Sequence, residues 1–300
     1  MSEHRKNGRK SCARRKKRGK RLFFKAAVCF LLLAVLAAGY AVFAEPKMLL
    51  EKTESYQSAK LDALPEKVKI AVFADTHFSE HYTPQDFEKA AEKINRSNPD
   101  FIFFLGDLID DFSTYEGDIR EVEEALASLR AKTAKIAVFG NHDYGGEMEF
   151  RYPDVMEAGG FQLLINESIA FDEYNLTVLG VDDMVIGYGD PRSADILTDD
   201  RYNVVLCHEP DVADELTETY TDLMLSGHTH GRQINLRMFD SYILPAYGKK
   251  YIKGDYDLER ADGNNLQLYV TGGIGTTKIP VRFASPPEIN IIELNKFPES

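Results

Sequence analysis

Five short apolar runs, each ending in a polar cluster, are the feature that most restricts how this chain can fold. They are VKIAVFAD (68–75), FIFFLGD (101–107), KIAVFGNHD (135–143), NVVLCHE (203–209) and LMLSGHTH (223–230). Between the first three runs lie two stretches of helical character, residues 83–95, with Pro84 at the first helical position, and residues 119–130. This alternation predicts βαβ units. A parallel sheet covered on both faces explains why the strands are continuously apolar.

The second half of the chain has a different pattern. Residues 161–181 and 266–294 contain short alternating stretches, with turns at Asp262-Gly263 and Gly272-Gly273. Such alternation is typical of strands with one covered face, so we expect a second, partly antiparallel sheet there. The predicted fold class is therefore α/β.

A run of nineteen residues without a charge, from Ala26 to Ala44, precedes these strands. As a helix it would be about 28 Å long, close to the thickness of the hydrocarbon core of a bilayer. A buried soluble helix would need a polar stripe or an amphipathic period, and the run has neither. We therefore interpret residues 26–44 as a transmembrane signal anchor.

The charges around this segment predict its orientation. Residues 1–44 contain twelve Lys or Arg against the single acid Glu3. Because basic flanking residues stay on the cytoplasmic side, residues 1–25 would form a cytoplasmic tail and the remainder would lie outside, in a single-pass protein of the cell membrane. Val42 and Ala44 also suit a signal-peptide cleavage site, so retention of the anchor stays open.

Beyond the anchor, residues 45–67 are mixed and polar and are interpreted as a spacer before one domain, residues 68–300. After residue 44 the chain holds 24 bases against 47 acids, a formal charge of −23. An acidic surface repels a phosphate backbone, so we expect no bulk binding of nucleic acid.

Each of the five loops carries a side chain that binds metal ions well. These side chains are Asp75 and His77, Asp107, Asn141, His208, and His228 with His230. A single histidine is more often a packed or surface residue than a ligand. Several buried carboxylates and imidazoles together are costly unless they are paired or bound to metal. Because active sites of open sheets lie beyond the carboxyl ends of the strands, the joint pattern predicts a metal centre.

The donor types indicate the chemistry. Carboxylate, amide oxygen and imidazole suit manganese, iron or zinc, and the absence of thiolates argues against a structural zinc site. Asp107 supplies a carboxylate that can bridge two ions. Two cations about 3.5–4 Å apart lower the pKa of a shared water and neutralise a phosphoryl group. The leaving oxygen then needs a proton donor, and His142 held by Asp143 fits that need.

Five motifs in order carry a resemblance to a known family. They are D-x-H at 75–77, G-D at 106–107, G-N-H-D at 140–143, the isolated His208, and G-H-x-H at 227–230. Over residues 68–294 the chain resembles the calcineurin-like metallophosphoesterase superfamily. The sequences around His208 and after Gly227, with V-T-G-G-I-G-T near the end, are similar to its bacterial membrane-associated or exported phosphodiesterases.

The resemblance implies a four-layer α/β/β/α sandwich and a role for each residue. Asp75, His77 and His230 would hold one divalent ion, Asn141, His208 and His228 the other, and Asp107 would bridge them. His142 would protonate the leaving group, with Asp143 orienting it.

The remaining polar residues leave alternatives open. Arg232 stands where the subgroup often has a second glycine, and a substrate-phosphate contact and a solvated surface role are equally open. Asp110 and Asp111 are better interpreted as a loop cap or surface charges. Arg282 is equally well a substrate contact or a packing residue.

We therefore expect hydrolysis of a phosphate ester, with a phosphodiester favoured, by hydroxide activated at a binuclear centre outside the membrane. The substrate could be lipid-linked or derived from the envelope. The alternatives are a phosphomonoesterase or pyrophosphatase acting on a lipid-linked substrate, and a catalytically silent metal-binding scaffold. Silent relatives would be expected to lose ligands or the proton donor, and here all are present. The sequence gives no indication of the oligomeric state.

Overall fold

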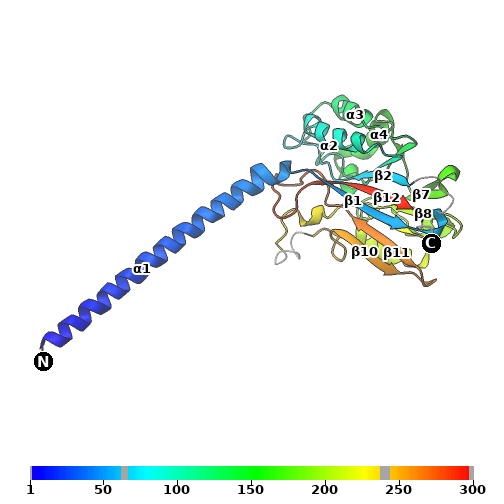
Figure 1. The fold of residues 1–300 in the computed structure, drawn as a ribbon. Helices are drawn as coiled ribbons and strands as arrows, with labels where there is room; N and C mark the ends of the chain where they lie inside the picture. Colours follow the sequence, from blue (N-terminus) through cyan, green and yellow to red (C-terminus); the bar gives the residue numbers. More distant parts are fainter. Residues whose placement is uncertain (1, 62–66, 237–243, 297–300) are drawn as a thin grey trace. The chain divides into compact units, whose positions relative to one another are not determined.

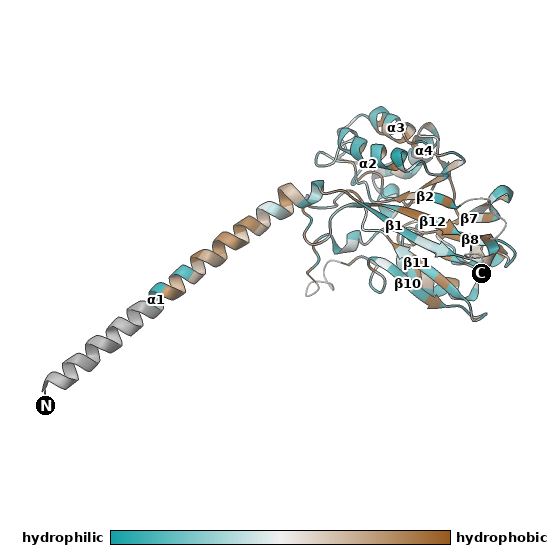
Figure 2. Ribbon diagram, in the orientation of Figure 1, coloured by the Kyte–Doolittle hydropathy of each residue, from teal (hydrophilic) through white to brown (hydrophobic). Residues whose placement is uncertain are grey.

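The computed structural model describes residues 2–61, 67–236 and 244–296. It divides into two units, Met1–Ala44 and Glu45–Ser300. In the first unit, α1 (Ser2–Gly39) continues into the π-helical turn η1 (Tyr40–Ala44). The described residues contain one helix long and apolar enough to cross a membrane, Lys20–Lys47. Figure 2 shows its apolar part as a continuous brown band.

The described residues of the second unit form two sheets of six strands each. The first has the order β1 (Leu50–Gln57), β12 (Glu288–Asn295), β2 (Val68–Phe73), β3 (Phe101–Phe104), β4 (Ala134–Ala137) and β5 (Gln162–Leu163). The second has the order β10 (Gly254–Glu259), β11 (Asn265–Val270), β9 (Leu223–Ser226), β8 (Tyr202–Leu206), β7 (Leu176–Gly180) and β6 (Glu167–Phe171). Both sheets are mixed. β2 to β5 run parallel, β12 is antiparallel to β2, and in the second sheet only the two outer pairs are antiparallel.

The α-helices of the second unit cover the first sheet (Figure 1). They are α2 (Pro84–Ser97), α3 (Ile119–Ala127) and α4 (Tyr152–Ala158). The start of α2 follows from its sequence, because Thr83 and Asp86 form a reciprocal capping box and Pro84 has no amide hydrogen to leave unpaired. Short helices complete the unit: η2 (Glu45–Lys47), η3 (Ala59–Leu61), η4 (Asn141–Phe150), η5 (Asp172–Tyr174), η6 (Pro191–Ile196), η7 (Pro210–Glu218) and η8 (His230–Arg232).

Three hydrophobic clusters separate the layers. Strand β2 shows the principle, since Phe73 packs toward the α-helices while Val72 packs between the two sheets. The third cluster lies on the outer face of the second sheet and includes Val212 and Leu216 of η7. All buried members of these clusters come from residue 56 onward, so the second unit has its own core.

The predicted α/β sandwich is confirmed, with two differences in detail. The outer layer over the second sheet is made of 3-10 helices rather than α-helices. The strand at 288–295, expected in the second sheet, is β12 of the first, as is the short β5.

The interpretation of residues 45–67 as a spacer was wrong for most of their length. Leu50–Gln57 forms β1, an edge strand that pairs in parallel with all eight residues of β12. Its sequence, LEKTESYQ, is charged and mostly exposed, as is common for edge strands, so it lacks the apolar pattern of a buried strand. Residues 62–66 of the predicted spacer lie outside the described residues.

Candidate metal centre

The five polar loops meet at one end of the two sheets. From the first sheet, Asp75 and His77 follow β2, Asp107 follows β3, and Asn141 begins η4 after β4. From the second sheet, His208 follows β8, and the loop after β9 carries His228 and His230. Backbone hydrogen bonds join these loops, from the Asp75 amide to the Gly106 carbonyl at 3.0 Å and from the Gly227 amide to the His208 carbonyl at 3.0 Å.

The backbone at this edge adopts a conformation that side chains other than glycine rarely accept. Five of the predicted ligands have φ between 44° and 71°: Asp75, His77, Asp107, His228 and His230. Left-handed backbone at such residues costs on the order of 1–3 kcal/mol each and persists where the surrounding structure and a function require it. The fold therefore holds these side chains inward against their local preference.

Two glycines allow the loops to approach so closely. Gly106 has φ +91°, and a Cβ there would overlap the backbone of Gly140. A Cβ at Gly140 would in turn overlap the Asp107 carboxylate and approach the His208 ring to 2.9 Å. A side chain at either glycine would displace the Asp107 loop.

The donor atoms form two clusters, Asp75 with His77 and His230, and Asp107 with His208 and His228; a third group, His77 with Asp107 and His142, overlaps both. In the first, His230 Nε2 lies 3.0 Å from His77 Nε2 and 3.6 Å from Asp75 Oδ1. In the second, Asp107 Oδ2 lies 3.1 Å from His208 Nε2, and the same oxygen lies 3.4 Å from His77 Nε2 of the first cluster. The Asp107 carboxylate therefore lies between the clusters, where a bridging ligand would have to be.

These spacings fit donors that share a cation. Atoms bound to one ion at about 2.1 Å are about 3.0 Å apart in octahedral and about 3.4 Å apart in tetrahedral geometry. Several buried donor atoms also have no hydrogen-bond partner among the described residues: Asp75 Oδ2, Asn141 Oδ1 and His208 Nε2. Unsatisfied buried polar atoms are costly, so their convergence supports a metal site.

Outer contacts fix which ring nitrogen is free for a metal. His208 Nδ1 lies 2.6 Å from the carbonyl oxygen of Leu105, and His228 Nε2 lies 2.8 Å from that of Ala246. A carbonyl oxygen only accepts, so each of these nitrogens carries the hydrogen. The opposite nitrogen, His208 Nε2 or His228 Nδ1, is left as the donor toward a cation.

Burial and neighbouring charges decide which groups are ionised. Burial raises the pKa of Asp75. Burial and the charge of His208 lower the pKa of His228 to about 4, and burial holds the pKa of His230 well below its usual value. Burial also favours the neutral form of Asp107, but the nearby imidazoles, His208 first, hold its pKa well below the ordinary range. Burial lowers the pKa of His208, but the Asp107 charge raises it more, so His208 carries a proton that a bound cation would displace. Anionic Asp107 and neutral His228 and His230 are suited to binding a cation without such an exchange.

His142 stands beside the clusters. Its ring lies 4.6 Å from the ring of His77, edge to face, and its amide donates to Asp107 Oδ1 at 2.8 Å. Its Nδ1 contacts the carbonyl oxygen of Asp110, which leaves Nε2 as the other ring nitrogen. Burial lowers the pKa of His142, but the charges of Asp107 and Asp110 raise it more.

The structure does not give Asp143 the predicted role of orienting His142. Its carboxylate accepts hydrogen bonds from the amides of Asp107 at 2.8 Å, Leu108 at 2.9 Å and Gly140 at 2.8 Å. Asp143 follows His142 in the chain, yet its carboxylate is directed to the backbone of the Asp107 loop. Burial and the Asp107 charge raise the pKa of Asp143 to about 7. Asp143 therefore fixes the backbone of the loop that carries Asp107.

Asp110 contacts the rings of His77 and His142, and the sequence analysis did not predict this role. Its Oδ1 lies 3.1 Å from His77 Nδ1, and its backbone carbonyl contacts His142. The contact directs His77 Nε2 toward the cluster. No sequence signal separated Asp110 from Asp111, whose carboxylate bonds to Ser113 in an exposed turn.

The clusters open into a cavity of about 430 Å³. Asp107, Asn141, His142, His228 and His230 form its metal-facing side, and the predicted substrate residue Arg232 lies in its wall. The other wall includes apolar side chains from Ile234, Pro245 and Ile279, next to Lys278. Arg282 is not part of the lining. It is fully buried, and its guanidinium donates to the carbonyls of Gly272, Gly275 and Ser285, which confirms the packing interpretation.

Comparisons with known proteins show which family this sequence matches. The family described as calcineurin-like phosphoesterase matches residues 68–232. The uncharacterized metallophosphoesterase YkuE of Bacillus subtilis (strain 168) is 35% identical over 288 residues, covering 93% of this chain and 98% of that protein. Phosphodiesterase YaeI of Escherichia coli (strain K12) is 28% identical, covering 75% and 82%. A Danio rerio transmembrane protein with metallophosphoesterase domain is 24% identical, covering 91% and 63%. Both donor clusters fall within the matched segment.

Proposed function

The chain belongs to the calcineurin-like phosphoesterase family and is a phosphoric ester hydrolase, and from that premise we propose that it is a phosphodiesterase with two divalent ions, Mn, Fe or Zn. One observation carries the proposal: two clusters of buried Asp and His donors with Asp107 between them. Two bound cations would activate water at neutral pH and neutralise the phosphoryl charge.

The residues around the clusters have separate tasks in this proposal. Asp75, His77 and His230 hold one ion, Asn141, His208 and His228 hold the other, and Asp107 bridges them.

His142 supplies the proton to the leaving oxygen, since its ring lies beside His77 and its Nε2 is not used by the Asp110 contact. Asp110 orients His77 and His142, and Asp143 fixes the loop that carries Asp107. Arg232, in the cavity wall, binds non-bridging phosphoryl oxygens.

The cavity supports a diester over a monoester. A monoester presents one organic group, whereas this cavity continues past the metal-facing side to a wall of Ile234, Pro245 and Ile279. That wall has room for the second organic group of a diester. The similarity to a relative named as a phosphodiesterase points the same way.

We place the second unit, Glu45–Ser300, which we now call the catalytic unit, outside the cytoplasm. The basic residues before the uncharged segment favour a cytoplasmic N-terminus. An envelope phosphate ester, including a lipid-linked one, would then be within reach.

The proposal is tested by comparing kcat/KM for bis(p-nitrophenyl) phosphate and p-nitrophenyl phosphate with the purified full chain in detergent. We expect the diester to be preferred about tenfold or more, because only the diester has a second organic group that can pack against the apolar wall. The variant Ile234→Ala should narrow that preference. A preference for the monoester would contradict the diester assignment while leaving the family unaffected.

A further inference from the structure

Glu45 is the first residue after the uncharged segment 26–44, yet its side chain is fixed inside the catalytic unit. The residue is 1% exposed. Its Oε2 accepts from the amide of Ala284 at 3.0 Å and its Oε1 from the amide of Ser285 at 2.6 Å. A buried carboxylate with two charge-assisted hydrogen bonds holds its backbone in place, so no flexible linker separates residue 44 from the catalytic unit.

Residues 276–285, the rim loop, connect Glu45 to the metal centre. Ser285 Oγ donates to the carbonyl of His230 at 2.9 Å, and the amide of Phe283 donates to the carbonyl of Gln233 at 2.9 Å. The Gln233 side chain fixes the other end of the loop, because it donates to the Thr277 carbonyl at 3.1 Å and accepts from the Thr277 amide at 2.9 Å. Two hydrogen bonds, from Ser285 to Glu45 and from Ser285 to His230, therefore connect Glu45 to a residue that lines the metal cavity.

Chain connectivity places the Ser285 end of this loop near the bilayer surface. The nineteen uncharged residues give a helix of about 28 Å, which uses the full hydrocarbon thickness of about 30 Å. The headgroup layer adds about 5–7 Å on each side. Glu45 follows the last uncharged residue directly, and Ser285 is hydrogen-bonded to it, so this end of the rim loop lies at the depth of the headgroups.

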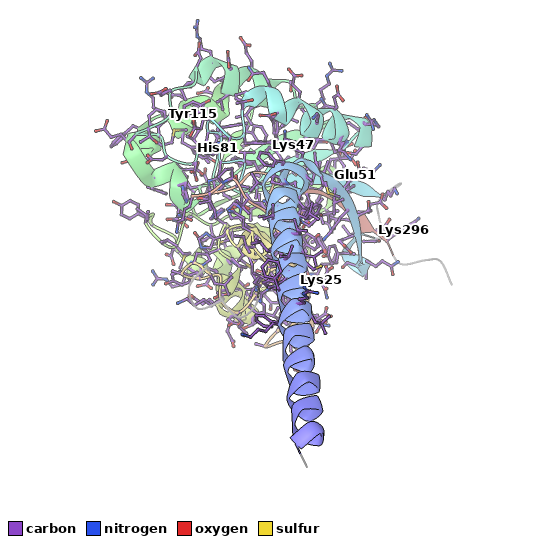
Figure 3. All side chains as sticks on the ribbon, turned by 90° about the vertical axis from the view of Figure 1, so that its left-hand side faces the viewer. Lys25, Lys47, Glu51, His81, Tyr115 and Lys296 are labelled. Atoms are coloured by element: carbon purple, nitrogen blue, oxygen red, sulfur yellow. The ribbon has the colours of Figure 1, made fainter. Side chains whose placement is uncertain are left out.

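The rim loop exposes a basic and an apolar side chain, which together suit contact with lipid. Lys278 is exposed and has φ +63°, and Ile279 beside it is 49% exposed. Both residues line the metal cavity and also a neighbouring cavity of about 540 Å³ that includes His81 and Tyr115. Figure 3 shows His81, Tyr115 and Lys47 on one side of the catalytic unit. A lysine and an apolar side chain together suit an interface of anionic headgroups and acyl chains.

We propose that the rim loop rests on the bilayer surface and that the site takes its phosphodiester from a lipid in the same membrane. The inference rests on the proposed phosphodiesterase function. Lys278 meets the phosphate layer, Ile279 enters the acyl boundary, and the apolar wall of the metal cavity receives the lipid part of the substrate.

The test is to let the site move away from the membrane surface on a longer linker, without changing the site or the anchor. The full chain is reconstituted with Mn²⁺ in phosphatidylcholine vesicles containing dioleoylphosphatidyl-p-nitrophenol, and water-soluble bis(p-nitrophenyl) phosphate is assayed in parallel. A Gly/Ser segment of about 20 residues is inserted between Ala44 and Glu45, which lets the site move by about 25 Å. We expect turnover of the lipid diester to fall about tenfold while the soluble diester changes less than about twofold.

A point variant checks the same contact independently. Ile279→Asp should lower turnover of the lipid diester more than that of the soluble one. Ile196→Asp, a matched change at a 64% exposed isoleucine of η6, should alter neither.

The outcomes separate this inference from the function it rests on. Turnover of the soluble diester, with lipid turnover absent or unaffected by the insertion, would overturn the membrane contact and leave the phosphodiesterase in place. No turnover of either substrate would overturn the function itself.

Discussion

Replacing Asp110 with alanine should weaken metal binding more than it weakens catalysis by His142. The side chain of Asp110 contacts His77 Nδ1 at 3.1 Å, whereas it lies 3.9 Å from His142 Nδ1, whose nearer contact is with the Asp110 backbone carbonyl, which the substitution keeps. Loss of the Asp110 charge should also lower the pKa of His142, so kcat is compared at the pH optimum of each variant. Loss of an outer partner of a metal-binding histidine costs about 10–100-fold in affinity, or about 1.4–2.7 kcal/mol. The half-saturating Mn²⁺ concentration should rise by that factor, and kcat at saturating Mn²⁺ should stay within about threefold of wild type.

The assay is hydrolysis of bis(p-nitrophenyl) phosphate against buffered free Mn²⁺, with calorimetric titration of the metal as a second measure. Asp110→Asn, which keeps an oxygen facing His77, should show a shift of less than about tenfold. Asp111→Ala is the matched control, since its carboxylate bonds only within an exposed turn, and it should change nothing. Unchanged Mn²⁺ affinity together with a large loss of kcat would refute the reasoning and place Asp110 in the chemistry.

Three further substitutions test the proton donor, the bridging ligand and a buried ion pair. His142→Ala should lower kcat by about 10²-fold or more while two metals per chain remain by elemental analysis, and equal loss of metal would make His142 a ligand. Asp107→Asn should weaken both sites together in the same analysis, and two tightly held ions would exclude a bridging role. Burial favours the neutral form of Glu288, but the ammonium groups of Lys253 at 2.8 Å and Lys52 at 2.9 Å hold its pKa below the ordinary 4.5. The folded pKa is thus the lower one, so these pairs contribute stability above about pH 4.5 that is lost as pH falls through the folded value. Urea unfolding of Glu288→Gln should show a shallower acid-induced loss than wild type, and an unchanged pH profile would contradict the linkage.

The buried strands could be predicted because burial on both faces leaves a direct trace in the sequence. In β2 and β3 every strand position except Lys69 is buried, so the apolar runs at 68–73 and 101–104 are continuous. The ends of these strands identified the site for the same reason, since polar side chains directly after a buried strand are hard to explain by packing. The structure brings all seven predicted ligands to one edge, and their binding of metal stays a prediction.

The parts that could not be predicted depend on partners far away in the chain. Strand β1 has an exposed, charged sequence, and what makes it a strand is the backbone of β12, more than 200 residues later. The local pattern of an edge strand carries little of this information.

The positioning carboxylates were missed for a similar reason. Asp143 adjoins His142 in sequence, but its carboxylate accepts from the amides of Asp107 and Leu108 in the loop after β3, and from the Gly140 amide in its own loop. Asp110 and Asp111 differ only in the direction that the loop gives each carboxylate, and that direction is set by tertiary contacts. Sequence spacing was a better guide to the predicted ligands, which the structure brings together, than to the carboxylates that contact their loops.

The most direct test of the central claim is whether turnover depends on two bound metal ions. The purified full chain is stripped with a chelator, and hydrolysis of bis(p-nitrophenyl) phosphate is measured as Mn²⁺, Fe²⁺ or Zn²⁺ is returned, with bound metal counted in the same samples. We expect turnover to be absent after chelation and to return as the bound metal approaches two ions per chain. Turnover that survives complete removal of metal, or two bound ions with no turnover of any phosphate ester, would contradict it.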